Sequence, residues 1–260
     1  MRVILRVLSF GVLLLCSLSM SAAEGGKTVT LLFTNDFESA YDPTPAFWRE
    51  DMQRIGGIAQ LATLIENIRA QHSNVFLFDA GDIFTGTLAK LTRGELSFEL
   101  MLSMGYDAMV IGNHEFEYGW EELARQKHRV PFPVLGANLF YRGTTHAFAQ
   151  PYTVLERRGV RIGVIGILGQ DAATALVPSH IAGLDVLEPA AVVRRYVELL
   201  RPNVDLMVVL THQGYTAPMQ TDDEADPTVQ RGNAENIALA GAVPGIDVIL
   251  AGHTDAGTRT

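Results

Sequence analysis

The chain has 260 residues, 48% of them hydrophobic and 19% charged, and its formal net charge is −9. This length and apolar content fit a folded α/β domain and exclude an intrinsically disordered chain. The negative charge disfavours non-specific binding to nucleic acid, so we expect no nucleic-acid partner. An anionic substrate would need a local positive centre, such as bound metal.

Residues 1–23 have the pattern of a secretory signal peptide. Arg2 and Arg6 give it a positive start, an apolar stretch runs from Val7 to Leu18, and Ser21-Ala22-Ala23 offers small residues for cleavage. The apolar stretch is shorter than the roughly 20 residues that a membrane span needs. We therefore predict an exported chain, periplasmic or secreted, with no stable membrane anchor after cleavage.

Cys16 is the only cysteine, and cleavage would remove it. Its lipidation is an alternative, although Leu15 is a poor match because lipidation sites usually carry a small residue before the cysteine. The mature chain would then contain no disulfide, which an exported chain of this size can do without.

Apolar runs typical of buried strands alternate with stretches of helical spacing along the rest of the chain. Strands are predicted at 29–33, 75–78, 108–111, 134–137, 152–156, 161–168, 206–210 and 248–251. Helices are predicted at 58–68, 96–104, 121–127, 189–200 and 234–240. This order predicts a layered α/β fold with a mostly parallel central sheet or sheets flanked by helices.

Two polar segments are predicted to be loops. Residues 41–54 contain Phe47 and Trp48, which could stack on a base, although packing of this loop on its own domain is favoured. Residues 220–232 are acidic and polar, as in a mobile loop.

Five of the predicted strands end at residues that can bind a metal. These residues are Asp36 with Glu38, Asp82, Asn113, His212, and His253 with Asp255. Parallel strands bring their carboxyl ends to one edge of a sheet, so we expect these side chains to converge. Oxygen and imidazole donors without thiolate suit Mn, Mg, Zn or Fe, and two such ions about 3.5–4 Å apart would clamp a phosphoryl group and activate a water.

The motifs resemble those of the calcineurin-like metallophosphoesterases, and within them the 5′-nucleotidase and UDP-sugar hydrolase family. The matching pieces follow the family's order and are Thr34-Asn35-Asp36, Gly56-Gly57, Asp79-Ala80-Gly81-Asp82, Thr85-Gly86-Thr87, Gly105-Tyr106-Asp107-Ala108, Gly112 to Gly119, Thr211-His212 and Ala251-Gly252-His253. They cover nearly the whole mature chain. The resemblance is specific for the family and does not specify the substrate.

The resemblance implies a role for each matching residue. Asp82 would bridge two divalent ions, one of them held also by Asn113, His212 and His253. The other ion would be held by Asp36, Asp82 and the residues at 38 and 255. His114 would face the phosphate, and the acid at position 117 would orient it.

The chain departs from the family pattern at three of these positions. The family usually has His at 38 and 255 and Asp at 117, whereas this chain has Glu38, Asp255 and Glu117. Two divalent ions from among Mn, Mg, Zn, Co and Ca are expected, and one of them would have only oxygen ligands, which favour Mg, Mn or Ca over Zn. The alternative is that Glu38 and Asp255 point to solvent and that this ion is weakly held or absent.

We therefore expect residues 24–260 to form a metallophosphoesterase catalytic domain, incomplete at its C-terminal end and without the family's C-terminal substrate-binding domain. The expected reaction is hydrolysis of a small-molecule phosphate ester, a 5′-nucleotide or related nucleotide, by a metal-bound hydroxide. A non-catalytic metal- or nucleotide-binding domain is one alternative. A two-metal hydrolase of another ester, as in the family's thiosulfohydrolase relatives, is the other.

Overall fold

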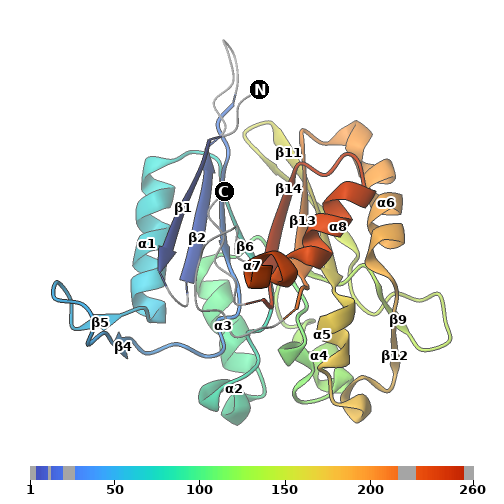
Figure 1. The fold of residues 1–260 in the computed structure, drawn as a ribbon, viewed down its shortest axis with the longest axis horizontal. Coiled ribbons are helices and arrows are strands. Elements are labelled where there is room, and N and C mark those ends of the chain that lie inside the picture. The colour runs from blue at the N-terminus through green and yellow to red at the C-terminus, as the bar shows by residue number, and fades with distance from the viewer. Residues whose placement is uncertain (1–3, 11–12, 20–26, 216–226, 255–260) are drawn as a thin grey trace.

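The computed structural model describes residues 4–10, 13–19, 27–215 and 227–254, and it contains two four-stranded sheets that face each other (Figure 1). In the first sheet, β3 (Thr30–Thr34), β6 (Val75–Asp79), β7 (Ala108–Val110) and β8 (Val134–Leu135) are all parallel and lie in that order. The second sheet has the order β10-β11-β13-β14. In it, β10 (Tyr152–Arg157) is antiparallel to β11 (Val160–Leu168), and β13 (Leu206–His212) and β14 (Val248–Gly252) run parallel to β11.

Helices cover the outer face of each sheet. The first sheet carries α1 (Ile58–Gln71), α3 (Glu95–Met104) and α4 (Trp120–Gln126). The second carries α6 (Pro189–Leu200) and α8 (Ala234–Ala242). The predicted α/β fold with flanking helices is therefore confirmed, and all the predicted strands and helices are present to within a few residues at their ends.

Alternation of side chains along the strands produces the layers, because successive residues of a strand point to opposite faces. Leu31 and Phe33 of β3 join the cluster of buried side chains between the two sheets, whereas Leu32 between them joins the cluster under α1 and α3. In β13, Val208 faces the first sheet and Val209 packs with residues of α6 and α8. Both faces of each sheet are thus buried, as parallel strands require.

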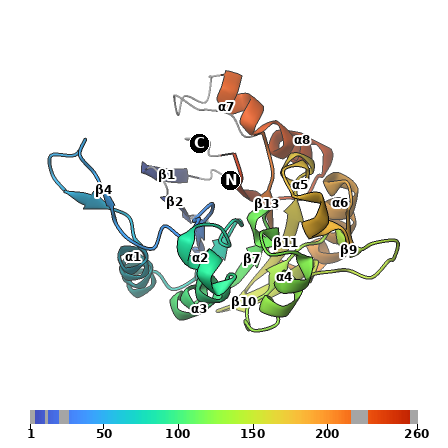
Figure 2. The ribbon, with the colours of Figure 1, turned by 90° about the horizontal axis from the view of Figure 1, so that it is seen from below.

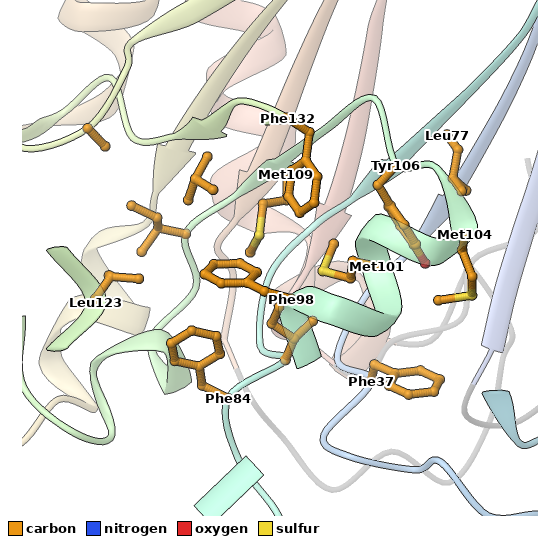
Figure 3. Packing of buried hydrophobic residues seen from close by; sticks show 14 of the residues in the cluster. Phe37, Leu77, Phe84, Phe98, Met101, Met104, Tyr106, Met109, Leu123 and Phe132 are labelled. Carbon is orange, nitrogen blue, oxygen red and sulfur yellow. The ribbon is translucent and has the colours of Figure 1, made fainter. Parts of the chain in front are cut away.

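The cluster between the first sheet and its helices is rich in aromatic and methionine side chains (Figure 3). The ring of Phe84 meets Phe98 edge-on at a centroid distance of 5.0 Å, and Phe98 meets Phe132 in the same way at 6.0 Å. Such pairs add to the burial of apolar area. Phe84 follows Asp82 by two residues, so this cluster anchors the loop that carries a predicted metal ligand.

The sequence did not predict the smaller elements. These are β4 (Thr44–Pro45), β5 (Arg54–Ile55), β9 (Leu139–Tyr141), β12 (Leu184–Val186), α2 (Thr87–Thr92), α5 (Gln170–Thr174), α7 (Pro227–Gly232) and the 3₁₀ turns His114–Phe116, Pro178–Ile181 and Arg201–Asn203. The predicted loop 220–232 is wrong over α7, and residues 220–226 lie outside the described residues.

The two tryptophans have different surroundings. The segment 41–54 includes β4, which pairs with β5, and it projects from the body (Figure 1). Between these two strands, Phe47 is 93% exposed and Trp48 is 69% exposed. The expectation that this loop packs on its own domain is therefore wrong for Phe47 and Trp48, whereas Tyr41 at the start of the segment is buried against the first sheet's helices. Trp120, at the start of α4, is half-buried, with its ring edge-on to Tyr141 and Phe148.

Within the predicted signal peptide, β1 (Ile4–Phe10) and β2 (Leu13–Ser19) form an antiparallel hairpin. Its cleavage stays a prediction. In the part of the chain that the structure describes, we find no helix with the length and apolar character of a membrane span.

Candidate metal centre

The carboxyl ends of β3, β6, β7, β13 and β14 meet at one edge of the molecule, which faces the viewer in Figure 2. Backbone hydrogen bonds tie the turns after these strands together. Asp36 N–H donates to Gly81 O at 3.0 Å, and Glu38 N–H donates to Asp82 O at 3.1 Å. The turn after β3 and the turn after β6, more than 40 positions apart in the sequence, are thereby held together.

Asp82 lies at the centre of this edge and is only 3% exposed. Its Oδ1 accepts a hydrogen bond from His114 N–H at 2.8 Å, and its Oδ2 lies 3.0 Å from His212 Nε2. Burial raises the pKa of Asp82, but the neighbouring His212 and His114 more than offset this and leave the pKa below its ordinary value. Asp82 is therefore an anionic group in a buried place.

His212 is fully buried, and both of its ring nitrogens have partners. Nδ1 lies 2.7 Å from Ala80 O, which can only accept, so Nδ1 carries a proton. Nε2 faces Asp82 and also Asn113 Oδ1, at 3.0 Å. Burial lowers the pKa of His212, but Asp82 outweighs it and raises the pKa to about 10.

His253 and Asp36 join the two sheets across the edge. The backbone N–H of His253 donates to both carboxylate oxygens of Asp36, at 3.1 and 3.0 Å. The rings of His253 and His212 lie 5.0 Å apart. The absence of a side chain at Gly252 lets the end of β14 lie against the turn after β6, because a Cβ there would be 2.6 Å from Ala80 O.

The imidazole and carboxylate donors gather in two overlapping groups. Asp82, His212 and His253 offer ligand atoms that all lie within 4.8 Å of one another, as do Glu38, Asp82 and His114. Asp82 belongs to both groups, which is the arrangement expected of a bridging ligand.

His114 lies beside Asn113 in the turn after β7. Its Nδ1 lies 2.6 Å from Glu117 Oε1, and its Nε2 is 3.9 Å from Glu38 Oε1 and 4.0 Å from Asp82 Oδ2. Burial lowers the pKa of His114, but Asp82 and Glu117 outweigh it and raise the pKa above its ordinary value.

The donors fit divalent cations. His212 Nε2 faces two acceptor oxygens, so in the absence of another cation it must carry a proton that balances Asp82. A divalent ion in contact with Asp82, Asn113 and His212 would replace that proton and supply positive charge opposite Asp82, with one further positive charge for another anionic ligand. Nitrogen and oxygen donors suit this first group, whereas the carboxylates of Asp36 and Glu38 offer only oxygen.

Several of these residues have left-handed backbone conformations that only glycine adopts readily. The φ angles are 49° at Asp36, 47° at Glu38, 67° at Asp82 and 84° at His253. Each such residue costs on the order of 1 kcal/mol, and such strain concentrates at functional sites. Gly81, with φ of 96°, lies so close to His212 that a Cβ would be 2.7 Å from Nδ1.

Sequence reasoning missed Glu115, which is completely buried. Its carboxylate accepts hydrogen bonds from the N–H groups of Gly112, Asp82 and Ile83 at 2.6, 2.9 and 2.7 Å. It therefore ties the turn after β6 to the turn after β7. No local pattern reveals this role, because two of the donors lie 32 and 33 residues away.

A second missed carboxylate, Asp79, lies behind the edge and is 1% exposed. It accepts a hydrogen bond from Thr34 Oγ1 at 2.6 Å and one from Gly81 N–H at 2.9 Å. The Thr34 hydroxyl also lies 2.7 Å from Tyr106 Oη. Burial raises the pKa of Asp79 well above its ordinary value.

The structure thus brings together eight of the nine residues singled out from the sequence. They are Asp36, Glu38, Asp82, Asn113, His114, Glu117, His212 and His253. Asp255 lies outside the described residues. The roles of these residues as ligands or catalytic groups stay predictions.

The chain is similar to a known protein family and to several members of it. The model of the calcineurin-like phosphoesterase family matches residues 30–256. The 5′-nucleotidase of Vibrio cholerae serotype O1 is 32% identical over 242 residues, which cover 89% of this chain and 41% of that protein. Protein UshA of Yersinia enterocolitica is 33% identical over 244 residues, covering 90% of this chain and 42% of that protein.

A solved structure gives the same result. The crystal structure of a 5′-nucleotidase precursor from Thermus thermophilus matches with a TM-score of 0.71 and 30% identity, over 86% of this chain and 41% of that one. The chain therefore spans about two fifths of the length of the relatives that it matches.

Proposed function

The chain belongs to the calcineurin-like phosphoesterase family, as its motifs predicted, and on this basis we propose that it is a metal-dependent hydrolase of a phosphate ester. The proposed substrate is a 5′-nucleotide or a related nucleotide. The observation that carries this proposal is the pair of ligand groups that share Asp82, with His114 beside them.

Each residue has a proposed part in the reaction. Asp82 would bridge two cations, with Asn113, His212 and His253 around one of them and Asp36 and Glu38 around the other. When bound, such cations stabilise the charge on phosphoryl oxygens and make a water nucleophile more acidic. His114, with its pKa raised, is a proton donor to the leaving oxygen, and Glu117 holds its ring by the contact at Nδ1.

The two cation positions are proposed to differ in chemistry. Asp36, Glu38 and Asp255 bring only oxygen to one of them, which favours Mg, Mn or Ca. Metal analysis after stripping and reloading tests this asymmetry, because two equivalents of tightly held Zn would contradict it.

Activity is tested with p-nitrophenyl phosphate and 5′-AMP in the presence of Mn, Mg, Co or Zn. Asp82→Ala should remove both bound metal and turnover, because both ligand groups lose their shared member. His114→Ala should reduce turnover about 10²–10⁴-fold, the usual contribution of a proton-transfer residue, with metal still bound. His146→Ala, in an exposed loop, is the matched control and should change neither.

The outcomes separate the rival functions. Metal binding without turnover of either compound with any ion would favour a non-catalytic binding domain. Turnover of another ester in place of these two would retain the metal chemistry and change the substrate. Loss of metal in His114→Ala would show that its proposed role is wrong.

Export is also proposed, from the leader pattern of residues 1–23. Mass spectrometry of the secreted or periplasmic protein should find an N-terminus at Glu24. An intact N-terminus would contradict this proposal, and a lipid on Cys16 would support the alternative.

A further inference from the structure

One buried ring nitrogen at the metal centre lacks a partner. His253 is 6% exposed, and its Nε2 has no hydrogen-bond partner among the described residues. An unpaired polar atom in such a place costs on the order of 1–3 kcal/mol, so a partner for Nε2 is expected in the working protein. That partner is a cation or a hydrogen-bond donor if Nε2 carries the lone pair, and a hydrogen-bond acceptor if Nε2 carries the proton.

Asp171 is placed to be that partner. It lies in the first turn of α5, directly after β11, and its Oδ2 is 3.7 Å from His253 Nε2. This distance is slightly too long for a hydrogen bond. The Asp171 side chain is 31% exposed, which leaves it room to rotate toward the ring.

A backbone hydrogen bond holds the turn that carries Asp171 next to His212. Gly169 N–H donates to His212 O at 2.8 Å, so the turn after β11 is tied to the residue that carries the other imidazole. β11 therefore ends at this edge as well, and Asp171 follows its last residue by three positions.

We infer that Asp171 is a positioning residue that accepts the Nε2 proton of His253 and leaves Nδ1 with the lone pair for a cation. The inference rests on the proposed metal centre. The same device is already visible in His212, whose Nδ1 proton is held by Ala80 O while Nε2 faces Asp82. Histidine ligands generally have such an outer acceptor, which fixes the tautomer and the ring orientation.

Two variants of Asp171 and one neighbour test the inference. Asp171→Ala removes the acceptor, Asp171→Asn keeps an acceptor oxygen without the charge, and Gln170→Ala changes an adjacent α5 side chain whose amide donates to Leu187 O. Calorimetric titration of the full chain with Zn²⁺ should show Asp171→Ala about 10–100-fold weaker at the site that involves His253. Asp171→Asn should recover most of that loss, and Gln170→Ala should match wild type.

Nitrogen-15 NMR of histidine-labelled protein gives a readout that a merely structural role would not move. In the Zn²⁺-loaded wild type, Nε2 of His253 should be protonated and Nδ1 metal-bound. In Asp171→Ala without metal, the two tautomers should be mixed. Metal on Nε2 would overturn the inference, as would wild-type affinity in both Asp171 variants.

His253→Ala and Asp82→Ala separate failure of the inference from failure of the metal centre. If both bind Zn²⁺ as wild type does, the proposed centre is wrong and the inference falls with it. If both lose affinity while Asp171→Ala does not, only the role of Asp171 is wrong. Melting of each variant in EDTA identifies any loss that is due to misfolding.

Discussion

At the scale of single residues, buried carboxylates organise the edge that carries the ligands. Asp79 and Glu115 hold the turns from which Asp82 and Asn113 project. Glu115 accepts hydrogen bonds from three backbone N–H groups, and Asp79 accepts one from a backbone N–H and one from the Thr34 hydroxyl.

Asp79 should make stability depend on pH. Its folded-state pKa is raised by burial, so between its unfolded and folded pKa values the native state binds more protons than the unfolded state. Stability is then fully present below the unfolded pKa and is lost as pH rises through the folded pKa. Asp79→Asn should reduce this loss, which urea unfolding in EDTA between pH 4 and about 8 would measure. An unchanged slope in the variant would contradict the assignment.

Glu115→Ala should be strongly destabilising, by roughly 3 kcal/mol or more, because three buried N–H groups lose their acceptor. Metal affinity should fall as well, since the turns that carry Asp82 and Asn113 lose their shared anchor. Urea unfolding and metal titration provide the measurements. The exposed Glu121→Ala is the matched control and should change each by little. A similar effect of both variants would show that Glu115 has no special role.

The donors on the strand ends could be predicted from the sequence because each follows its own apolar run. Asp36, Asp82, Asn113, His212 and His253 needed only the rule that parallel strands end together. Glu115 and Asp171 could not be found in this way. Their partners are backbone groups or side chains from distant segments, and those contacts exist only after folding.

At the scale of elements, α6 illustrates a helix whose start is encoded locally. Pro189 occupies its first turn, as predicted, and the Glu188 carboxylate accepts hydrogen bonds from Ala190 N–H and Ala191 N–H. These bonds satisfy two of the N–H groups that a helix start leaves unpaired.

Glu188→Ala should therefore lower the free energy of unfolding by about 1 kcal/mol, the usual loss on removal of a helix cap. The metal centre should be unaffected, because α6 packs on the outer face of the second sheet. Glu198→Ala, an exposed residue of the same helix, is the control. A loss of metal affinity in Glu188→Ala would show that α6 is coupled to the centre.

The elements that the sequence did not predict are short or depend on distant partners. β9 and β12 have three residues each and pair across more than 40 positions, as in Phe140 with Asp185. α2 and α5 have six and five residues, too few to show a helical period. Local patterns predict long elements well and cannot predict such pairings.

At the scale of the whole molecule, the candidate centre lies across the junction of two sheets. Asp36, Asp82 and Asn113 follow strands of the first sheet, whereas His212 ends one strand of the second sheet and His253 follows another. Strand periodicity predicted a mostly parallel arrangement. It did not predict the break between β8 and β10 that divides the strands into two facing sheets.

A cation bound by both sheets should stabilise the folded chain. At a metal concentration of about 100 times Kd, the expected gain is about 2.7 kcal/mol, or roughly 5–10 °C in Tm for a chain of this size. Thermal unfolding in EDTA and in Mn²⁺ measures this gain, and Asp82→Ala should abolish it. Equal gains in wild type and in Asp82→Ala would show that the ion binds elsewhere.

The two tryptophans differ in exposure, and this difference allows fluorescence to report on the turn beside the candidate centre. Trp48 is exposed to solvent in the loop between β4 and β5, so a soluble quencher such as acrylamide should quench its fluorescence first. The emission that survives then comes from Trp120, one position after the turn that begins with Asn113 and ends at Gly119. Titration of quenched protein with a diamagnetic cation would follow that turn selectively, without any label.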